Sequence, residues 1–244
     1  MTLRNVQFFT EETEVPGVYL VSFSGDSRFY NWLEVHLSRS FGKNALDCVE
    51  LYGIWFFLIF LEAAGNYRTA RNFGVTVSRP SVRKHLLETV ESSDIAPHAN
   101  AARTILYGID KIGLDQRPGW VSRAKEEGGI AVQWDGDPCP YQTVPNERFG
   151  ALGITYHAVD QYFNRTRREG RQDQMLSKLQ KLARAATHEV ELPKDVQFRK
   201  ILTHGFEQKY IKTLAAPRGW MLVTAPDNKR GYLRVISVYQ SNIG

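Results

Sequence analysis

The sequence predicts an α+β protein that is mainly helical, in which N-terminal and C-terminal β-strands share a small antiparallel sheet. Segments rich in valine, tyrosine and phenylalanine, bounded by turn residues, lie near both ends of the chain and favour strands. Between them, apolar residues recur at helical spacing. With 244 residues, 43% of them hydrophobic, the chain is long enough to bury a sizeable core.

The first two strands are expected on either side of an acidic connection. Val6–Phe9 and Val18–Phe23 have the composition of strands. A helix is predicted at Phe29–Phe41, where aromatic and aliphatic residues recur at intervals of three and four before Gly42, a typical helix stop.

A helix buried on most of its faces is predicted at about Ala45–Ala64. Its centre is the apolar run Leu51–Leu61, LYGIWFFLIFL. A bilayer span needs about 20 apolar residues, so this shorter run predicts a core helix and no membrane span. The first residues lack a basic start followed by an apolar run, and we expect no secretory signal.

Further helices are expected before a loop-rich connection. They are Tyr67–Phe73, Arg79–Val90, with Pro80 in its first turn, and Ala99–Ile112. Residues 115–150 contain four prolines and several glycines and are predicted to be a loop-rich connection, with a short strand at Gly129–Trp134.

The C-terminal region is expected to contain helices and a closing β-hairpin. The helices are predicted at Tyr156–Phe163, Gln172–Ala186 and Val196–Leu214. The hairpin strands are predicted at Trp220–Thr224 and Tyr232–Tyr239. These elements give an N-terminal region at 1–114, a connection at 115–150 and a basic helical region at 151–244, unless all three form one domain.

Positive charge is concentrated towards the C-terminal end. Residues 161–244 contain 16 Lys+Arg and 7 Asp+Glu, whereas residues 1–160 contain 15 and 19. Basic charge gathered in one part of a chain favours a polyanionic partner, which is usually nucleic acid and sometimes an acidic membrane surface.

A basic helix within this region predicts a phosphate-binding surface. Met175, Leu179 and Leu182 fall on one helical face, so the basic residues of the helix point away from the core. Arginine and lysine side chains on such a surface can hold phosphate oxygens. The expected contacts are Arg165, Arg167, Arg168, Arg171, Lys178, Lys181 and Arg184.

A second basic segment lies at residues 60–88, FLEAAGNYRTARNFGVTVSRPSVRKHLLE. Ala70 lies four residues before Gly74, and a helix starting after Ser78 would place Val82 and Leu86 one turn apart. These positions resemble the helix-turn-helix of bacterial DNA-binding regulators, although the turn is about two residues longer than usual. An ordinary helical hairpin would give the same pattern. The resemblance implies outward-facing nucleic-acid contacts at Arg79, Arg83 and Lys84.

No motif in the sequence names a reaction. Phosphate-cradling, dinucleotide-binding, zinc-protease and esterase motifs are absent. Asp135 and Asp137 could hold a magnesium ion for phosphodiester hydrolysis, but the same residues are typical of a turn. His157, His188 and His204 lie in or near the basic region and could act at a scissile phosphate, or could be structural or surface residues. We therefore predict no catalytic residue, metal or cofactor.

Three hypotheses follow. The first is a non-enzymatic nucleic-acid-binding protein, either a DNA-binding regulator or an RNA-binding subunit of a ribonucleoprotein or nucleocapsid, with a homo-oligomer or larger assembly as a possible state. The second is a nuclease, and the third is a structural or assembly protein with an acidic protein partner. Tyr156, Tyr162 and Phe163 would favour single strands or RNA if they stack on bases, and otherwise belong to the core. The isolated Cys48 and Cys139 favour a reducing compartment, in the cytoplasm or at the nucleoid.

Overall fold

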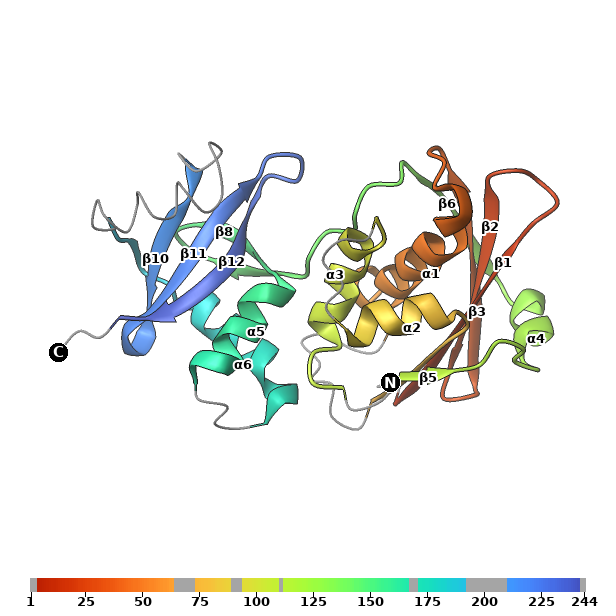
Figure 1. Cartoon of the computed structure of the whole chain (residues 1–244), viewed down its shortest axis with the longest axis horizontal. Coiled ribbons are helices and arrows are strands. Elements are labelled where there is room, and N and C mark those ends of the chain that lie inside the picture. Colours follow the sequence, from red (N-terminus) through yellow and green to blue (C-terminus); the bar gives the residue numbers. More distant parts are fainter. Residues whose placement is uncertain are drawn as a thin grey trace. The chain divides into compact units, whose positions relative to one another are not determined.

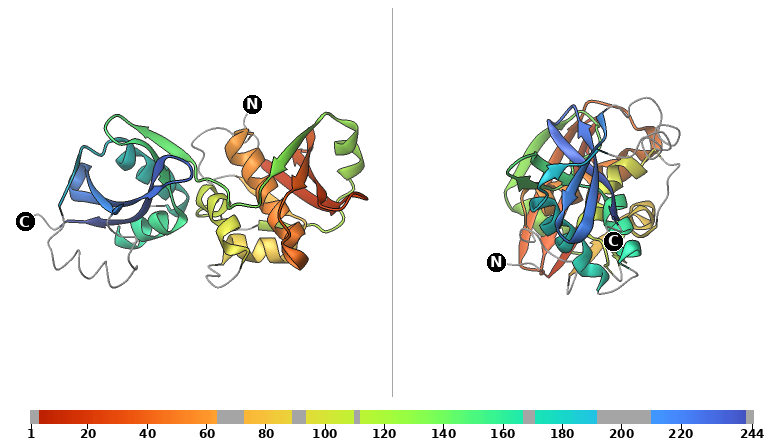
Figure 2. Two further views of the ribbon diagram at one scale, coloured as in Figure 1. Left: turned by 90° about the horizontal axis from the view of Figure 1, so that it is seen from above. Right: turned by 90° about the vertical axis from the view of Figure 1, so that its left-hand side faces the viewer.

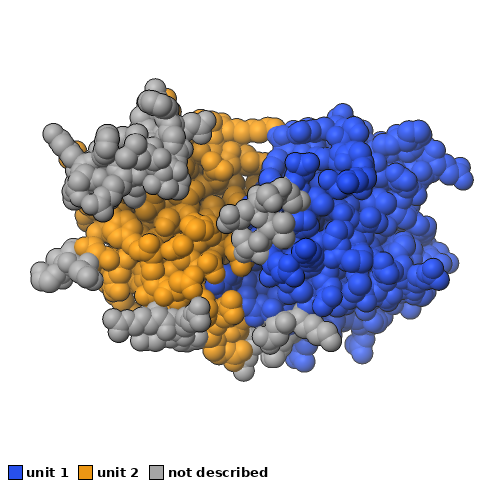
Figure 3. Space-filling model, viewed as in Figure 1, with its two compact units in different colours: residues 1–139 blue, residues 140–244 orange. Residues whose placement is uncertain are grey.

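The computed structural model describes residues 4–63, 73–88, 94–109, 112–166, 171–191 and 210–241. The chain divides into two compact units, residues 1–139 and 140–244 (Figure 3). Each unit has its own six-stranded mixed sheet and its own helices (Figures 1 and 2). The division falls within residues 115–150, but that segment also contributes strands to both sheets.

The predicted fold class, mainly helical with one small shared sheet, is wrong. Strands account for 36% and helices for 35% of the described residues. The N-terminal and C-terminal strands cannot pair with one another, because the inner strands of each sheet already have a neighbour on both sides. Several strands were missed because segments of three to five residues are too short to show a two-residue period.

The sheet of the first unit has the strand order β5-β4-β1-β2-β3-β6. The bounds are β1 Asn5–Glu12, β2 Val18–Gly25, β3 Phe29–Leu37, β4 Gly74–Val77, β5 Ile112–Leu114 and β6 Gly129–Trp134. The first three strands form an antiparallel meander. The others run parallel to the strand beside them, β4 to β1, β5 to β4 and β6 to β3. The strand expected at Gly129–Trp134 is therefore present as β6.

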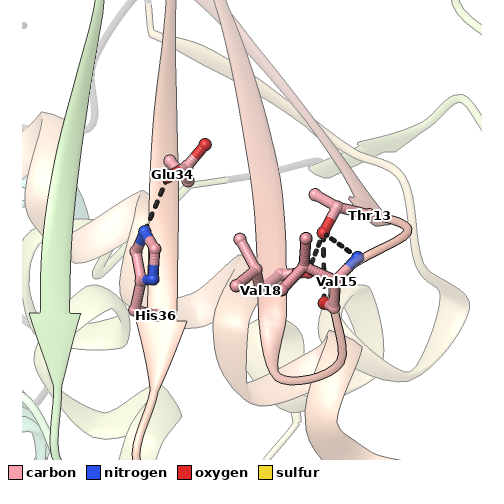
Figure 4. Close-up of polar contacts among 5 residues, drawn as sticks. All are labelled: Thr13, Val15, Val18, Glu34 and His36. Carbon is pink, nitrogen blue, oxygen red and sulfur yellow. Dashed lines mark hydrogen bonds and ion pairs between the residues drawn. The ribbon is translucent and has the colours of Figure 1, made fainter.

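The turn between β1 and β2 is closed by a threonine hydroxyl (Figure 4). Thr13 Oγ1 donates to the Val18 carbonyl at 2.9 Å and accepts from the Val15 amide at 3.1 Å. Figure 4 also shows the pair of Glu34 and His36, two residues apart on one face of β3, with 2.6 Å between Oε1 and Nε2.

The segment Phe29–Phe41, predicted as a helix, forms strand β3 instead. Leu33 and Val35 are buried at alternate positions, while Trp32, Glu34 and His36 share the opposite face. The apolar residues of this segment fit both a helical period and the two-residue period of a strand. The segment forms a strand because it pairs with β2 on one side and β6 on the other.

Two helices cover one face of this sheet with a third packed on them, and a fourth helix covers the other face (Figure 1). On the first face, α1 (Ala45–Trp55) follows the short 3₁₀ turn Gly42–Asn44 and continues as a π-helical turn at Phe56–Phe60. It is joined there by α2 (Pro80–Leu87) and α3 (Ala96–Ile105), and α4 (Val121–Glu126) lies on the opposite face.

The core between α1 and the sheet depends on aromatic packing and one glycine. The Phe23 and Phe57 rings are stacked with 4.4 Å between their centroids, and Phe8 packs against both. A Cβ atom on Gly53 would lie 2.5 Å from Val21 Cγ1, so glycine permits the close approach of α1 to β2.

The sheet of the second unit has the order β7-β8-β12-β11-β10-β9. The bounds are β7 Thr143–Asn146, β8 Gly150–Ile154, β9 His188–Glu189, β10 Lys212–Ala216, β11 Trp220–Asp227 and β12 Tyr232–Gln240. The predicted C-terminal hairpin is confirmed as β11 and β12. The predicted helix Val196–Leu214 is wrong at its C-terminal end, because strand β10 begins at Lys212. Residues 196–209 of this predicted helix lie outside the described residues.

Two helices, α5 (Tyr156–Arg165) and α6 (Met175–Arg184), pack against the second sheet. The hydroxyl of Thr155 accepts from the Ala158 amide at 3.2 Å and caps the start of α5. A 3₁₀ turn at Gln172–Gln174 precedes α6, which buries Met175 and Leu179 as the sequence predicts. Leu182, predicted on the same buried face, is half-buried, as is Lys178, while Lys181 and Arg184 are exposed.

Among the described residues, no helix is both long and apolar enough to cross a membrane. Cys48 and Cys139 are both buried and both free thiols.

Candidate nucleic-acid interface

A groove of about 810 Å³ lies on the second unit between the two helices, a turn and the ends of two strands. Its wall on the helix side comes from the last turn of α5 and the outer face of α6. The opposite wall is the 3₁₀ turn Pro217–Gly219, which joins β10 to β11, together with the end of β12. We call this feature the cationic groove, because Arg165, Lys178, Lys181 and Arg218 line it.

Helical spacing explains how the sequence places three of these cations. Lys178 and Lys181 are three residues apart on α6 and so lie on one side of the helix. Arg165 lies in the last turn of α5, where a positive charge also interacts favourably with the helix dipole. Its Nε donates to Gln161 Oε1 at 3.2 Å, a neutral partner that leaves the positive charge uncompensated.

Two buried aromatic rings form the floor of the groove. Tyr162 is 7% exposed and Trp220 is 6% exposed, and their centroids lie 4.7 Å apart with the rings edge to face. Burial raises the pKa of Tyr162, and the nearby Arg218 opposes that rise. Because each ring is covered by the other and by the core, neither presents a free face on which a nucleobase could stack.

Within the described part of the chain, no carboxylate lines the groove. Among the described residues, no acidic side chain forms an ion pair with Lys178, Lys181 or Arg218. Like charges held together repel one another, so a bound anion would relieve the repulsion. The groove is therefore suited to a ligand that carries several negative charges.

The other predicted contacts in the second unit lie elsewhere. Arg171 forms a two-bond ion pair with Asp173, at 3.0 and 3.3 Å, and Arg184 lines a separate hollow with Pro145. Arg167 and Arg168 lie outside the described residues. Of the seven predicted basic contacts, the structure brings Arg165, Lys178 and Lys181 together in the groove.

The second predicted patch belongs to the first unit, not to the unit that carries the groove. Arg79 forms an ion pair with the buried Asp47, and Arg83 Nε donates to the Ile112 carbonyl at 2.8 Å. Lys84 is exposed. Through their Nε atoms, Arg79 and Arg83 thus tie α2 to neighbouring segments of the first unit.

The helix-turn-helix interpretation fails on the turn itself. The motif requires a turn from Gly74 to Ser78, but Gly74–Val77 forms strand β4 between β1 and β5. The following helix does begin at Pro80, but it follows a strand, so the unit is a strand–helix crossover. Ala70, on which the first helix of the motif depends, lies outside the described residues.

The candidate catalytic residues that the structure describes belong to different units, Asp135 and Asp137 to the first and His157 and His188 to the second. The Asp137 amide donates to Asp135 Oδ1 at 2.9 Å, which is the hydrogen bond of a turn. His157 and His188 are exposed, and His204 lies outside the described residues. Across the described ranges, no group of three His, Cys, Asp or Glu side chains is placed to hold a metal ion.

Two buried titratable residues in the first unit were missed. Glu50 is fully buried, and both the amide and the hydroxyl of Ser78 donate to its carboxylate at 2.6 Å. Burial raises the pKa of Glu50 to about 7, against the opposing effect of the Ser78 hydrogen bonds and Arg79. Burial and Arg39 lower the pKa of His98 to about 4. No local pattern signals either residue, because their surroundings come from distant parts of the chain.

The sequence analysis also missed Arg218. It predicted a helix up to Leu214 where the structure has strand β10, so it did not predict a turn between two strands at Arg218. A basic residue between Pro217 and Gly219, at a turn between two strands, is the signal that could have identified it.

Comparison of the chain with protein-family models, with curated proteins and with solved structures finds no match. The chemistry of the cationic groove is therefore the main guide to function. Four cations around a neutral floor can hold several phosphate oxygens at once.

Proposed function

We propose that the protein binds nucleic acid through its phosphate backbone, with the cationic groove as the contact surface. The observation that carries this proposal is the convergence of Arg165, Lys178, Lys181 and Arg218 on one groove that no described carboxylate lines. Phosphate contacts of this kind supply most of the sequence-independent affinity of proteins for nucleic acid.

The floor of the groove favours contact with the backbone over contact with the bases. Tyr162 and Trp220 are covered, and the neutral polar side chains in the lining are Thr166 and Gln240. Base-specific recognition depends on side chains that reach base edges or stack on base faces. Binding should therefore depend little on sequence, which suits a subunit that coats or packs DNA or RNA better than a regulator that reads an operator.

The proposal places the protein inside the cell, in the cytoplasm or at the nucleoid, where nucleic acid is the ligand. Several copies along one strand would form a homo-oligomer or a larger assembly.

A salt titration of binding tests this proposal. We expect the protein to bind a fluorescent 20-nucleotide DNA strand with an affinity that falls as salt rises from about 50 to about 500 mM. With up to four phosphates neutralised, the slope of log affinity against log salt should be about −3. In the Lys178→Ala/Lys181→Ala variant, the slope should fall to about half of this value.

Lys43→Ala is the control, because Lys43 is an exposed lysine of the first unit. It should leave both affinity and slope unchanged. Binding that is insensitive to salt, or equally weakened by the control, would contradict the groove as a phosphate-binding surface. The same strand incubated with magnesium and run on a gel would give defined products if the protein were a nuclease.

A further inference from the structure

The turn that carries Arg218 has an unusual backbone for its sequence. Arg218 has φ 63° and ψ 32°, and Gly219 has φ 72°. The Trp220 amide donates to the Pro217 carbonyl, so the two residues occupy the central positions of a turn in which both are left-handed. This is the conformation of a type I′ turn, for which Asn-Gly is the strongly preferred pair.

An arginine in the first of these positions is destabilising. The Cβ atom of an L-residue in the left-handed region crowds the following carbonyl oxygen, and asparagine tolerates the region better. The strain is local, since the adjacent Gly219 adopts the same region without a Cβ atom.

Among the described residues, three other non-glycine residues have a positive φ: Asp26, Ser27 and Glu62. Asp26 has a structural role there, because its carboxylate accepts hydrogen bonds from the Arg4 and Asn5 amides at 2.7 to 3.1 Å. Arg218 differs, since its carbonyl accepts from Gln240 Nε2 at 3.3 Å but its guanidinium has no hydrogen bond within the described part of the chain. The fold therefore gains nothing visible from the arginine side chain.

The side chain does line the cationic groove, facing the cations of α5 and α6 from the opposite wall. Without it, the described residues on the strand side of the groove would carry no charge. A guanidinium there can hold two phosphate oxygens through two parallel N–H bonds, a planar geometry that lysine lacks.

We propose that Arg218 is a phosphate-binding residue of the groove and that its strained turn is maintained for this contact. Strained backbone is characteristic of functional positions, where the local penalty is offset by the rest of the fold. The inference rests on the proposed function and explains why the strained position on the strand side of the groove is an arginine.

Two substitutions separate the backbone effect from the charge effect. Arg218→Asn relieves the strain and removes the charge, so it should raise the urea midpoint of unfolding and weaken binding of the 20-nucleotide strand about three- to tenfold at about 100 mM salt. Its salt slope should fall by about 0.7–0.9. Arg218→Lys keeps both the charge and the strain, so its urea midpoint and salt slope should match those of the original protein. Its loss of affinity should be smaller than that of Arg218→Asn.

The outcomes distinguish this inference from the proposed function. If the unmodified protein does not bind the strand, both are overturned. If it binds, and Lys178→Ala/Lys181→Ala weakens binding while Arg218→Asn does not, the groove stands and the role of Arg218 is overturned. A lower urea midpoint in Arg218→Asn would show that the arginine stabilises the turn, and would also overturn the inference.

Discussion

Replacing Asn146 with aspartate is expected to lower the free energy of unfolding of the second unit by about 3 kcal/mol or more. Asn146 ends β7, and its side chain is 7% exposed. Its Nδ2 donates to the carbonyls of Ala183, Arg184 and Ala186, at 2.9 to 3.1 Å. In aspartate, a negative oxygen would face these carbonyls, and their hydrogen-bond partner would be lost.

The position matters because these carbonyls terminate α6, which carries Lys178 and Lys181. On the other side of the amide, Oδ1 accepts from the Arg148 and Phe149 amides at 2.9 and 3.0 Å. One side chain thus ties the end of the basic helix to the β7–β8 turn. Its loss should weaken the groove as well as the fold.

Hydrogen exchange measured on peptides from α6 is the appropriate test, because it reports the two units separately. The control is Asn164→Asp, since Asn164 is exposed and donates one hydrogen bond, to Asp160 at 3.1 Å. We expect the control to change the protection of α6 by no more than about 0.5 kcal/mol. Equal effects of the two substitutions would show that the Asn146 amide does not hold the helix.

Replacing Glu50 with glutamine is expected to change how the stability of the first unit depends on pH. The pKa of Glu50 is about 7 in the fold, against 4.5 as its ordinary value. Between these values the folded state binds a proton that the unfolded state does not, so the carboxyl group makes the fold less stable as pH rises. The full effect is about 3 kcal/mol, and it develops between about pH 4.5 and pH 7.

His98 acts in the opposite direction. Its pKa is about 4 in the fold and 6.5 ordinarily, so below pH 6.5 the unfolded state binds the extra proton. Its contribution is complete above pH 6.5 and is lost as pH falls to about 4. Because the two windows overlap, Glu50 and His98 offset one another in the unmodified protein.

Urea unfolding at a series of pH values separates the two groups. Four of the five tryptophans lie in residues 1–139, so tryptophan fluorescence reports mainly on this unit. As pH rises from 4.5 to 7, the free energy of unfolding of Glu50→Gln should increase relative to that of the original protein. For His98→Gln, the corresponding increase should occur as pH falls from 6.5 to 4. Differences that do not vary with pH in these windows would mean that neither group is buried as described.

Some elements were predictable because their signals are local. The spacing of Met175 and Leu179 is set by the helix period, and it fixed which side chains of α6 face outwards. The strands β11 and β12 were found because turn residues separate two runs of strand formers. The outward direction of Lys178 and Lys181 follows from the same reasoning.

Other elements depend on partners that are distant in sequence. Gly74–Val77 is a strand because β1 and β5 lie on either side of it, and nothing within its four residues requires that. The sequence predicts Arg79 as a free surface donor, but in the structure it pairs with Asp47, which lies 32 residues earlier in the chain. Local periodicity carries no information about such pairings.

The sequence by itself determined the asymmetry of charge and the amphipathic basic helix, since both depend only on which residues stand at which spacing. Only the tertiary structure decided that Arg218 joins that helix across a groove, that Trp220 and Tyr162 close the floor of the groove, and that Glu50 is buried against Ser78. The physical reason is that burial, strand pairing and the approach of like charges are set by which distant segments meet, and that depends on the packing of the whole unit.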